Sequence, residues 1–344
     1  MKSADYWQKR AEQVANRQHL KADKYITLLR REYDRAIRSI QRDIEVFYQR
    51  FAVNNEIDMA SSRKLLTSGE LKEFRMSLEE FIEKAKDNVD GRWTKELNNA
   101  YYKTRISRLE ALQIQIRHQI KTLNENVQEG TQALLGDVYK DTYYKTLFEI
   151  QKRTGIGTPF SKVHHEAVKK IISKPWVGGN FSQRIWSDRE KLLRELEINL
   201  SQVFVRGDSV DRTTQSLAKR MNVSYSNAAR IVRTETSNIV TEGTIDGYKA
   251  SGVVKKYEFL ATMDERTCEI CGPLDGMVFK LSEKQIGVNA SPLHPNCRCT
   301  TVAYFDSDEG ERIAKSEDGK SYYVPANMTY DTWYQKHVVG NKDQ

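Results

Sequence analysis

Apolar residues recur every three or four positions through the first part of the chain. The first stripe of such residues runs from Trp7 to Phe51, with a polar gap over 16–24. This spacing is typical of one face of an α-helix. None of the six prolines precedes Pro159, and a proline costs ~3 kcal/mol in a helix interior. The pattern predicts a helix over 5–51, about 70 Å long at ~1.5 Å per residue.

A second apolar stripe with the same spacing runs from Ile106 to Val127. Between the two stripes, the sequence from Ser68 indicates a break followed by a shorter helix through Ile82. Stripes of this kind are most often seams between packed helices. We therefore expect an elongated helical N-terminal domain over residues 1–152.

The segment 153–194 has a different pattern, because glycines and prolines interrupt short apolar pieces. We interpret it as a connecting region with one short helix around His165–Ile172. Residues 211–235 then have the layout of a helix-turn-helix, in which Asn222 would form the turn and Ser224 would cap the next helix. Such a pair of helices can read the major groove of DNA, but it also occurs in proteins that bind no DNA.

Beyond Gly252 apolar and polar residues alternate, as is typical of strands. Three short strands are predicted, over 253–262, 276–281 and 299–305, and they would form a small antiparallel sheet. The tail 306–344 is acidic and rich in aromatic residues, and we expect it to be partly ordered. The fold class is therefore α+β, mainly α-helical, with a small antiparallel sheet near the C-terminus.

Composition narrows the class of protein. Charged residues make up 30% of the chain and hydrophobic ones 39%, and no apolar run approaches the ~18 residues that span a bilayer. The first residues are polar and charged, which is unlike a secretory signal. We expect a protein made and used inside a cell, without a membrane partner. The formal net charge of +8 is compatible with weak, salt-sensitive binding to DNA through basic residues in 151–220.

The strongest chemical signal is a cluster of metal donors. All four cysteines lie within 32 residues, and a histidine falls among them. A disulfide framework would spread cysteines along the chain, whereas a C-x2-C pair on a tight turn brings two thiolates to one ion. Soft donors favour Zn²⁺. We expect four of five candidates to bind it, and these are Cys268, Cys271, His294, Cys297 and Cys299.

Two alternatives for this cluster stay open. Four protein ligands would close the coordination sphere and make the zinc structural. If only three residues bound, the open position could activate water, with Asp264 or Glu269 as the base. The cysteines could also be buried thiols without a metal. Because no other acid–base constellation lies nearby in the sequence, we favour structural zinc.

Four blocks in fixed order resemble the Mu F-like head morphogenesis proteins, which are minor capsid proteins of tailed bacteriophages. The blocks are Arg233-Thr-Glu-Thr, Gly252-Val-Val-Lys-Lys-Tyr, the segment from Thr262 to Gly276 with its C-x2-C pair, and His294-Pro-Asn-Cys-Arg-Cys. The resemblance covers about residues 195–305. It divides the chain into the N-terminal domain, the connecting region, a Mu F-like domain with a zinc clasp (195–305) and the tail.

The resemblance implies a non-enzymatic virion component, so no catalytic residues are carried over. It implies a place inside the phage head near the portal, and the host cytoplasm during assembly. The implied partners are the portal protein, capsid or scaffold proteins, and double-stranded DNA bound without sequence preference. We interpret Arg233 and Glu235 as a structural ion pair, or a contact of the helix-capping type, that fixes the long helix to the sheet.

Two other functions remain as alternatives to a role in head assembly and in DNA packaging or ejection. One is a zinc-containing helix-turn-helix regulator that would use residues 211–235. The other is a zinc-dependent hydrolase. The resemblance disfavours the regulator, because the second helix of the motif runs directly into the block at Arg233 and would pack against the sheet.

Overall fold

The computed structural model describes residues 4–54, 100–155, 157, 160, 162–206, 209–262, 269–305, 311–315, 321–325 and 336. Its helices are α1 (Ala4–Asn54), α4 (Ala100–Thr154), α5 (His165–Ser173), α6 (Phe181–Arg206) and α7 (Val210–Ser251). The two long N-terminal helices and the short helix near His165 confirm the sequence predictions. The break expected at Ser68 and the helix expected to end at Ile82 lie outside the described residues.

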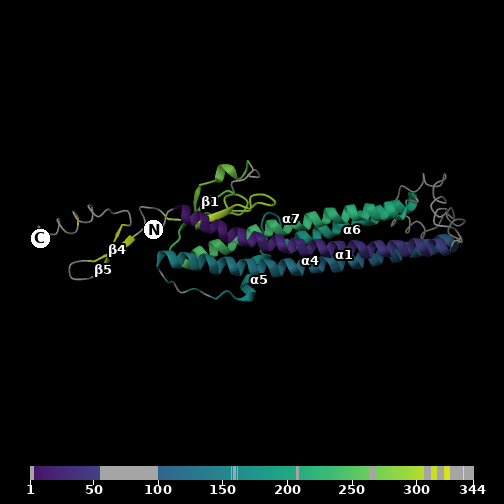
Figure 1. The fold of residues 1–344 in the computed structure, drawn as a ribbon, viewed down its shortest axis with the longest axis horizontal. Coiled ribbons are helices and arrows are strands. Elements are labelled where there is room, and N and C mark those ends of the chain that lie inside the picture. The colour runs from purple at the N-terminus through teal and green to yellow at the C-terminus, as the bar shows by residue number, and fades with distance from the viewer. Residues whose placement is uncertain are drawn as a thin grey trace.

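The four long helices lie side by side along the long axis of the molecule (Figure 1). One continuous apolar core joins them, with side chains from every helix almost fully buried. Tyr33 of α1, Ile120 of α4, Leu196 of α6 and Val232 of α7 are representative members. Burial of such side chains stabilises each by ~1.5–3 kcal/mol relative to exposure. The bundle is therefore held along its length and not only at its ends.

The shared core changes the expected domain division. Helix α7 packs against α1, α4 and α6, and the boundary predicted between residues 194 and 195 falls inside α6. The helices of residues 1–152 and those of residues 195–305 thus form one bundle. Periodicity predicted which face of each helix is apolar, but it contains no information about which helix covers that face.

The predicted helix-turn-helix is wrong, because α7 runs without interruption through residues 210–251. Asn222 is an exposed helical residue whose side chain accepts a hydrogen bond from Arg30 at 2.8 Å. Ser224 is buried, and its hydroxyl bonds Tyr33 of α1 and Asp188 of α6. An asparagine costs under ~1 kcal/mol in a helix interior. Packing against two neighbouring helices outweighs that cost, so no turn forms.

Local signals fix both ends of α7. The hydroxyl of Ser209 accepts a hydrogen bond from the backbone N–H of Arg212, which is a helix N-cap. Gly252 ends the helix with a left-handed backbone at φ 71°, a conformation that glycine adopts without steric cost. The chain then turns directly into the sheet.

The sheet contains β1 (Lys256–Leu260), β2 (Val278–Lys280) and β3 (Thr300–Tyr304) in the antiparallel order β2-β1-β3. These strands confirm the three predicted from alternation. A separate antiparallel pair, β4 (Glu311–Lys315) and β5 (Ser321–Pro325), follows in the tail. The sheet lies near the N-terminal end of α1 (Figure 1). None of the described helices is both long enough and apolar enough to cross a membrane.

Strand β1 connects two small cores. Tyr257 packs with Trp7 of α1 and Tyr248 of α7, which attaches the sheet to the bundle. Phe259, two residues further on the same face, packs instead with three cysteines. The sheet thus faces the helices at one end and the thiol groups at the other.

Candidate functional site

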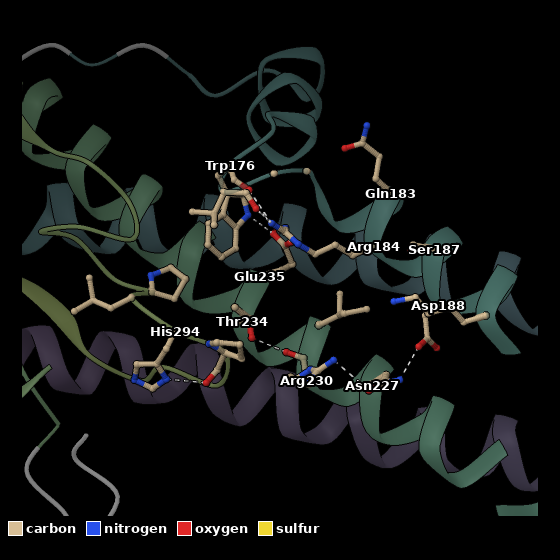
Figure 2. A pocket seen from close by; sticks show the side chains of 18 residues that line it. Trp176, Gln183, Arg184, Ser187, Asp188, Asn227, Arg230, Thr234, Glu235 and His294 are labelled. Carbon is tan, nitrogen blue, oxygen red and sulfur yellow. Dashed lines mark hydrogen bonds and ion pairs between the residues drawn. The ribbon is translucent and has the colours of Figure 1, made fainter. Parts of the chain in front are cut away.

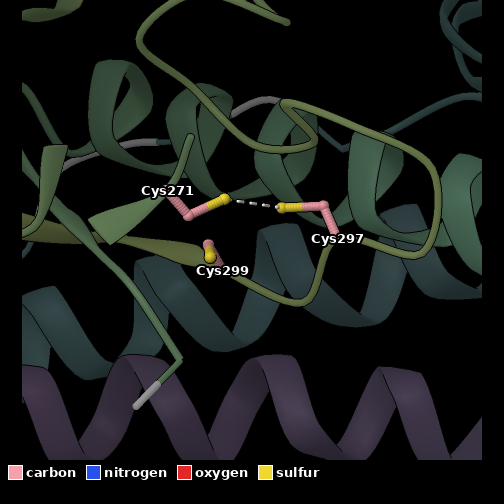
Figure 3. Close-up of side chains that lie close together, drawn as sticks. All are labelled: Cys271, Cys297 and Cys299. Carbon is pink, nitrogen blue, oxygen red and sulfur yellow. Dashed lines mark hydrogen bonds between the residues drawn. The ribbon is translucent and has the colours of Figure 1, made fainter. Parts of the chain in front are cut away.

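Three of the five predicted metal donors come together (Figure 3). The sulfurs of Cys271, Cys297 and Cys299 lie within 4.8 Å of one another, and all three residues are buried. The Sγ atoms of Cys271 and Cys297 are 3.9 Å apart. A tetrahedral zinc with Zn–S bonds of ~2.3 Å requires sulfurs about 3.8 Å apart. The spacing and the soft donor set therefore fit zinc.

Different elements bring these thiols together. Cys271 precedes the short 3₁₀ helix Gly272–Leu274, Cys297 lies in the loop before β3, and Cys299 directly precedes β3. A hydrogen bond from the Cys299 thiol, with another from Ser291, lowers the pKa of Cys297 below its ordinary value. The same thiol–thiol bond and burial raise the pKa of Cys299.

The remaining two candidates are separated from this cluster in different ways. Cys268 lies outside the described residues. His294 is not among the clustered donors. Its Nδ1 lies 2.8 Å from the carbonyl oxygen of Pro295, to which it donates. Its ring lines a neighbouring cleft (Figure 2). The spacing in the sequence placed His294 near Cys297 along the chain, but the bend of the loop turns its side chain elsewhere.

The cleft beside the thiol cluster encloses about 800 Å³. Its walls are the turn 176–179 with the beginning of α6, the middle of α7, and the loop 292–295 (Figure 2). The lining combines apolar groups such as Trp176 and Leu293 with charged ones such as Lys191 and Arg230. The segment that forms this wall of the cleft, residues 292–295, is therefore followed directly by Cys297 of the thiol cluster.

A buried carboxylate lies in this cleft. Glu235 of α7 is only 2% exposed, and it accepts hydrogen bonds from Trp176 Nε1 at 2.8 Å and from the guanidinium of Arg184. The same guanidinium donates to the backbone carbonyls of Trp176 and Val177 and stacks over the Trp176 ring. Burial raises the pKa of Glu235 above its ordinary value, although both partners favour the charged form.

The structure corrects the predicted ion pair between Arg233 and Glu235. Arg233 contacts Asp23 of α1 at 3.2 Å, on the surface, whereas Glu235 pairs with Arg184 of α6. Side chains two positions apart on a helix point ~200° apart, so they cannot meet. Thr234, between them, accepts the backbone N–H of Asn296 at 3.0 Å.

These three consecutive residues therefore fix three different neighbours of α7. Arg233 contacts α1, Thr234 contacts the loop that carries Cys297, and Glu235 contacts α6. Sequence reasoning found this block but missed the partners Trp176 and Arg184. The glycines around Gly178 do predict a turn at this point of the chain. They do not indicate that this turn reaches Glu235.

Comparison with known proteins finds one family model and one phage protein that resemble this chain. Residues 194–302 match the family described as Phage Mu protein F like protein. The chain is 25% identical over 244 residues to Minor head protein GP7 of Bacillus phage SPP1, an alignment that covers 66% of this chain and 78% of that protein. These matches support a phage head morphogenesis protein. Within that class, residues 194–302 are similar to the Mu F-like family.

A second relative carries the name of an enzyme. The chain is 22% identical over 269 residues to NAD(+)–arginine ADP-ribosyltransferase EFV of Enterococcus faecalis, which covers 73% of this chain and 54% of that protein. The chain thus spans about half the length of this relative. No solved structure matches the chain significantly.

Proposed function

We propose that this protein is a minor capsid protein of a tailed bacteriophage, located inside the head near the portal. It would act in procapsid assembly and in DNA packaging or ejection, with the portal and the capsid or scaffold proteins as partners. It would be present in the host cytoplasm during assembly. The observation that carries the proposal is the family match over residues 194–302, which includes the thiol cluster.

A structural role fits the ionisable groups of the cleft better than catalysis does. Glu235 is held by Trp176 and Arg184. Asp188, whose pKa is raised by burial, accepts hydrogen bonds from Ser224 and Asn227. Both carboxylates are thus hydrogen-bonded to other side chains of this protein, which is typical of a structural role. The alignment with the Enterococcus faecalis relative covers 54% of that protein. The activity in its name is therefore not carried over to this chain.

The same geometry disfavours the two alternative functions. A regulator that reads DNA through a helix-turn-helix would need the turn that α7 lacks. A zinc hydrolase would need an open coordination position that water can reach, whereas the three clustered thiols are buried. We propose a closed structural site in which Cys268 joins Cys271, Cys297 and Cys299, since the C-x2-C spacing brings Cys268 toward Cys271. His294 is then the candidate that does not bind.

Purified heads test the proposed role directly. Heads assembled with this protein are expected to show additional density at the portal vertex, and heads assembled without it are expected to lack that density. The measurement is asymmetric reconstruction of both samples by electron cryomicroscopy. Identical portal vertices in the two samples would contradict the proposal, as would density of this protein spread over the whole shell.

We also propose that DNA contacts α1 rather than residues 151–220. Arg31, Arg35, Arg38 and Arg42 follow one another by four, three and four positions on the solvent-facing side of α1. This spacing places them on one face within about 16 Å. Of the four, Arg35 makes an ion pair with a described residue, Glu32. Arginines at this spacing can neutralise successive phosphates without displacing strong partners.

A charge-matched pair of variants separates the two placements. Replacing the four α1 arginines by glutamine is expected to weaken binding to duplex DNA at low salt more than tenfold. It should also reduce the slope of log affinity against log salt by about 3.6, at ~0.9 for each of the four phosphate contacts. The control replaces the exposed lysines Lys162, Lys169, Lys170 and Lys174. Fluorescence anisotropy over a salt series measures both. A greater loss in the control would place the contact in 151–220 instead.

A further inference from the structure

We infer that a chain of two hydroxyl groups, from Ser237 of α7 through Ser291, orients Cys297 for metal binding. Ser237 and Ser291 are positioning residues in this inference, since neither binds the metal. It rests on the zinc proposed above. It adds that the helix bundle, and not only the sheet, determines how tightly the metal is held.

The hydrogen-bonded series from Ser237 through Ser291 to Cys297 is short and buried. The Oγ atoms of Ser237 and Ser291 are 2.9 Å apart, and Ser291 Oγ lies 3.4 Å from Cys297 Sγ. All three residues are at most 2% exposed, so water does not compete for these hydrogen bonds. Cys297 itself lies 3.9 Å from Cys271 within the thiol cluster.

Metal binding would fix the direction of both hydrogen bonds. A metal-bound cysteine is a thiolate, which can only accept hydrogen bonds. Ser291 must then donate its one hydroxyl proton to Cys297. Its oxygen is left to accept the proton of Ser237.

A second hydroxyl of α7 holds the other side of the same loop. Thr234 accepts the backbone N–H of Asn296 at 3.0 Å and donates its own proton to the carbonyl oxygen of Arg230 at 2.7 Å. The loop from Ser291 to Cys297 is thus attached to α7 near both ends. Hydrogen bonds that surround a metal's own ligands typically change its affinity by ~10–100-fold.

Zinc affinity in single and double variants tests the role of the two hydroxyl groups. Ser291→Ala is expected to weaken zinc binding at least ~10-fold, and Ser237→Ala is expected to weaken it less, since it acts only through Ser291. The double variant should bind as weakly as Ser291→Ala alone, because the two residues form one pathway. Competition with a chromophoric chelator measures the affinities of the full-length proteins.

Ser251→Ala is the matched control. Ser251 is also a buried serine of α7, and its hydroxyl bonds the carbonyl oxygen of Tyr248 at 2.6 Å instead of the loop. Zinc affinity should stay unchanged in this variant. If it falls as far as in Ser291→Ala, the effect is general loosening of α7 and the inference is wrong.

The absorption spectrum of the cobalt(II)-loaded protein gives a second measurement, which a general loosening of α7 would not change. Loss of a hydrogen bond to the thiolate raises the energy of the sulfur electrons, so the sulfur-to-cobalt charge-transfer band of Ser291→Ala should shift to longer wavelength. An unshifted band with wild-type zinc affinity overturns the inference while leaving the zinc proposal in place. Less than about half an equivalent of zinc in the freshly reduced wild type overturns both.

Discussion

Cys271→Ser is expected to eliminate stoichiometric zinc binding and to unfold the sheet well before the helix bundle. The sulfur of Cys271 is buried, 3.9 Å from that of Cys297, in a small core with five buried residues in the part of the chain that the structure describes. Structural zinc sites contribute ~10–16 kcal/mol of apparent binding free energy in small zinc domains, and that energy is folding energy. A serine hydroxyl at this position would not replace a thiolate ligand.

Metal analysis after exhaustive dialysis measures the first effect, and hydrogen exchange measures the second. Amides of β1 and β3 should lose protection, while those in the middle of the bundle keep it, because the bundle has its own apolar core. His294→Ala is the matched control, since its ring lines the cleft. It should retain a full equivalent of zinc. Loss of zinc in that variant would make His294 a ligand.

Arg184→Ala is expected to destabilise the protein by about 3–5 kcal/mol, because it leaves a buried charge without its ionic partner. Glu235 is 2% exposed and, among the described residues, would retain only the hydrogen bond from Trp176. The turn at residues 176–177 would lose its two bonds from the guanidinium as well. Urea unfolding, followed by circular dichroism, measures the change.

Arg233→Ala is the control for this prediction. Arg233 comes from the same block of α7 and also makes an ion pair, but its side chain is 45% exposed and that of Asp23 is 56% exposed. Exposed pairs of this kind contribute at most ~1 kcal/mol. Equal destabilisation by the two substitutions would contradict the assignment of Arg184 as the partner that Glu235 requires.

The loss in Arg184→Ala should also depend on pH. Burial already raises the pKa of Glu235 in the folded protein, and removal of Arg184 would raise it further. A carboxyl with a raised folded pKa binds more protons folded than unfolded, so stability falls as pH rises between the unfolded and folded pKa values. The variant should therefore lose less stability at pH 5 than at pH 8. A cost that is larger at pH 5 would contradict this reasoning.

Local patterns predicted the parts of the fold that depend on local properties. The stripe from Trp7 to Phe51 and the alternation after Gly252 reflect which face of each element is apolar, and both elements form as expected. Asn222 was misleading because a turn residue in an exposed helical position costs little once both flanking stretches pack. Which elements meet is a long-range property that periodicity does not contain.

In the candidate site, too, local features could be predicted from the sequence and long-range contacts could not. The spacing of Cys271, Cys297 and Cys299 along the chain was sufficient to predict that their thiols meet, because thiols at such spacing have few other uses in one chain. The direction of His294 depends on the bend of a single loop. The contact of Glu235 with Arg184 joins residues 51 positions apart, and no motif in the sequence indicates it.

The continuity of α7 has a mechanical consequence. Its 42 residues form a strut about 60 Å long, which begins at the far end of the bundle and ends where the sheet is attached. No hinge interrupts it, so a partner that grips and displaces the sheet would move the opposite tip of the bundle with it. Such a strut would carry load from one end of the protein to the other.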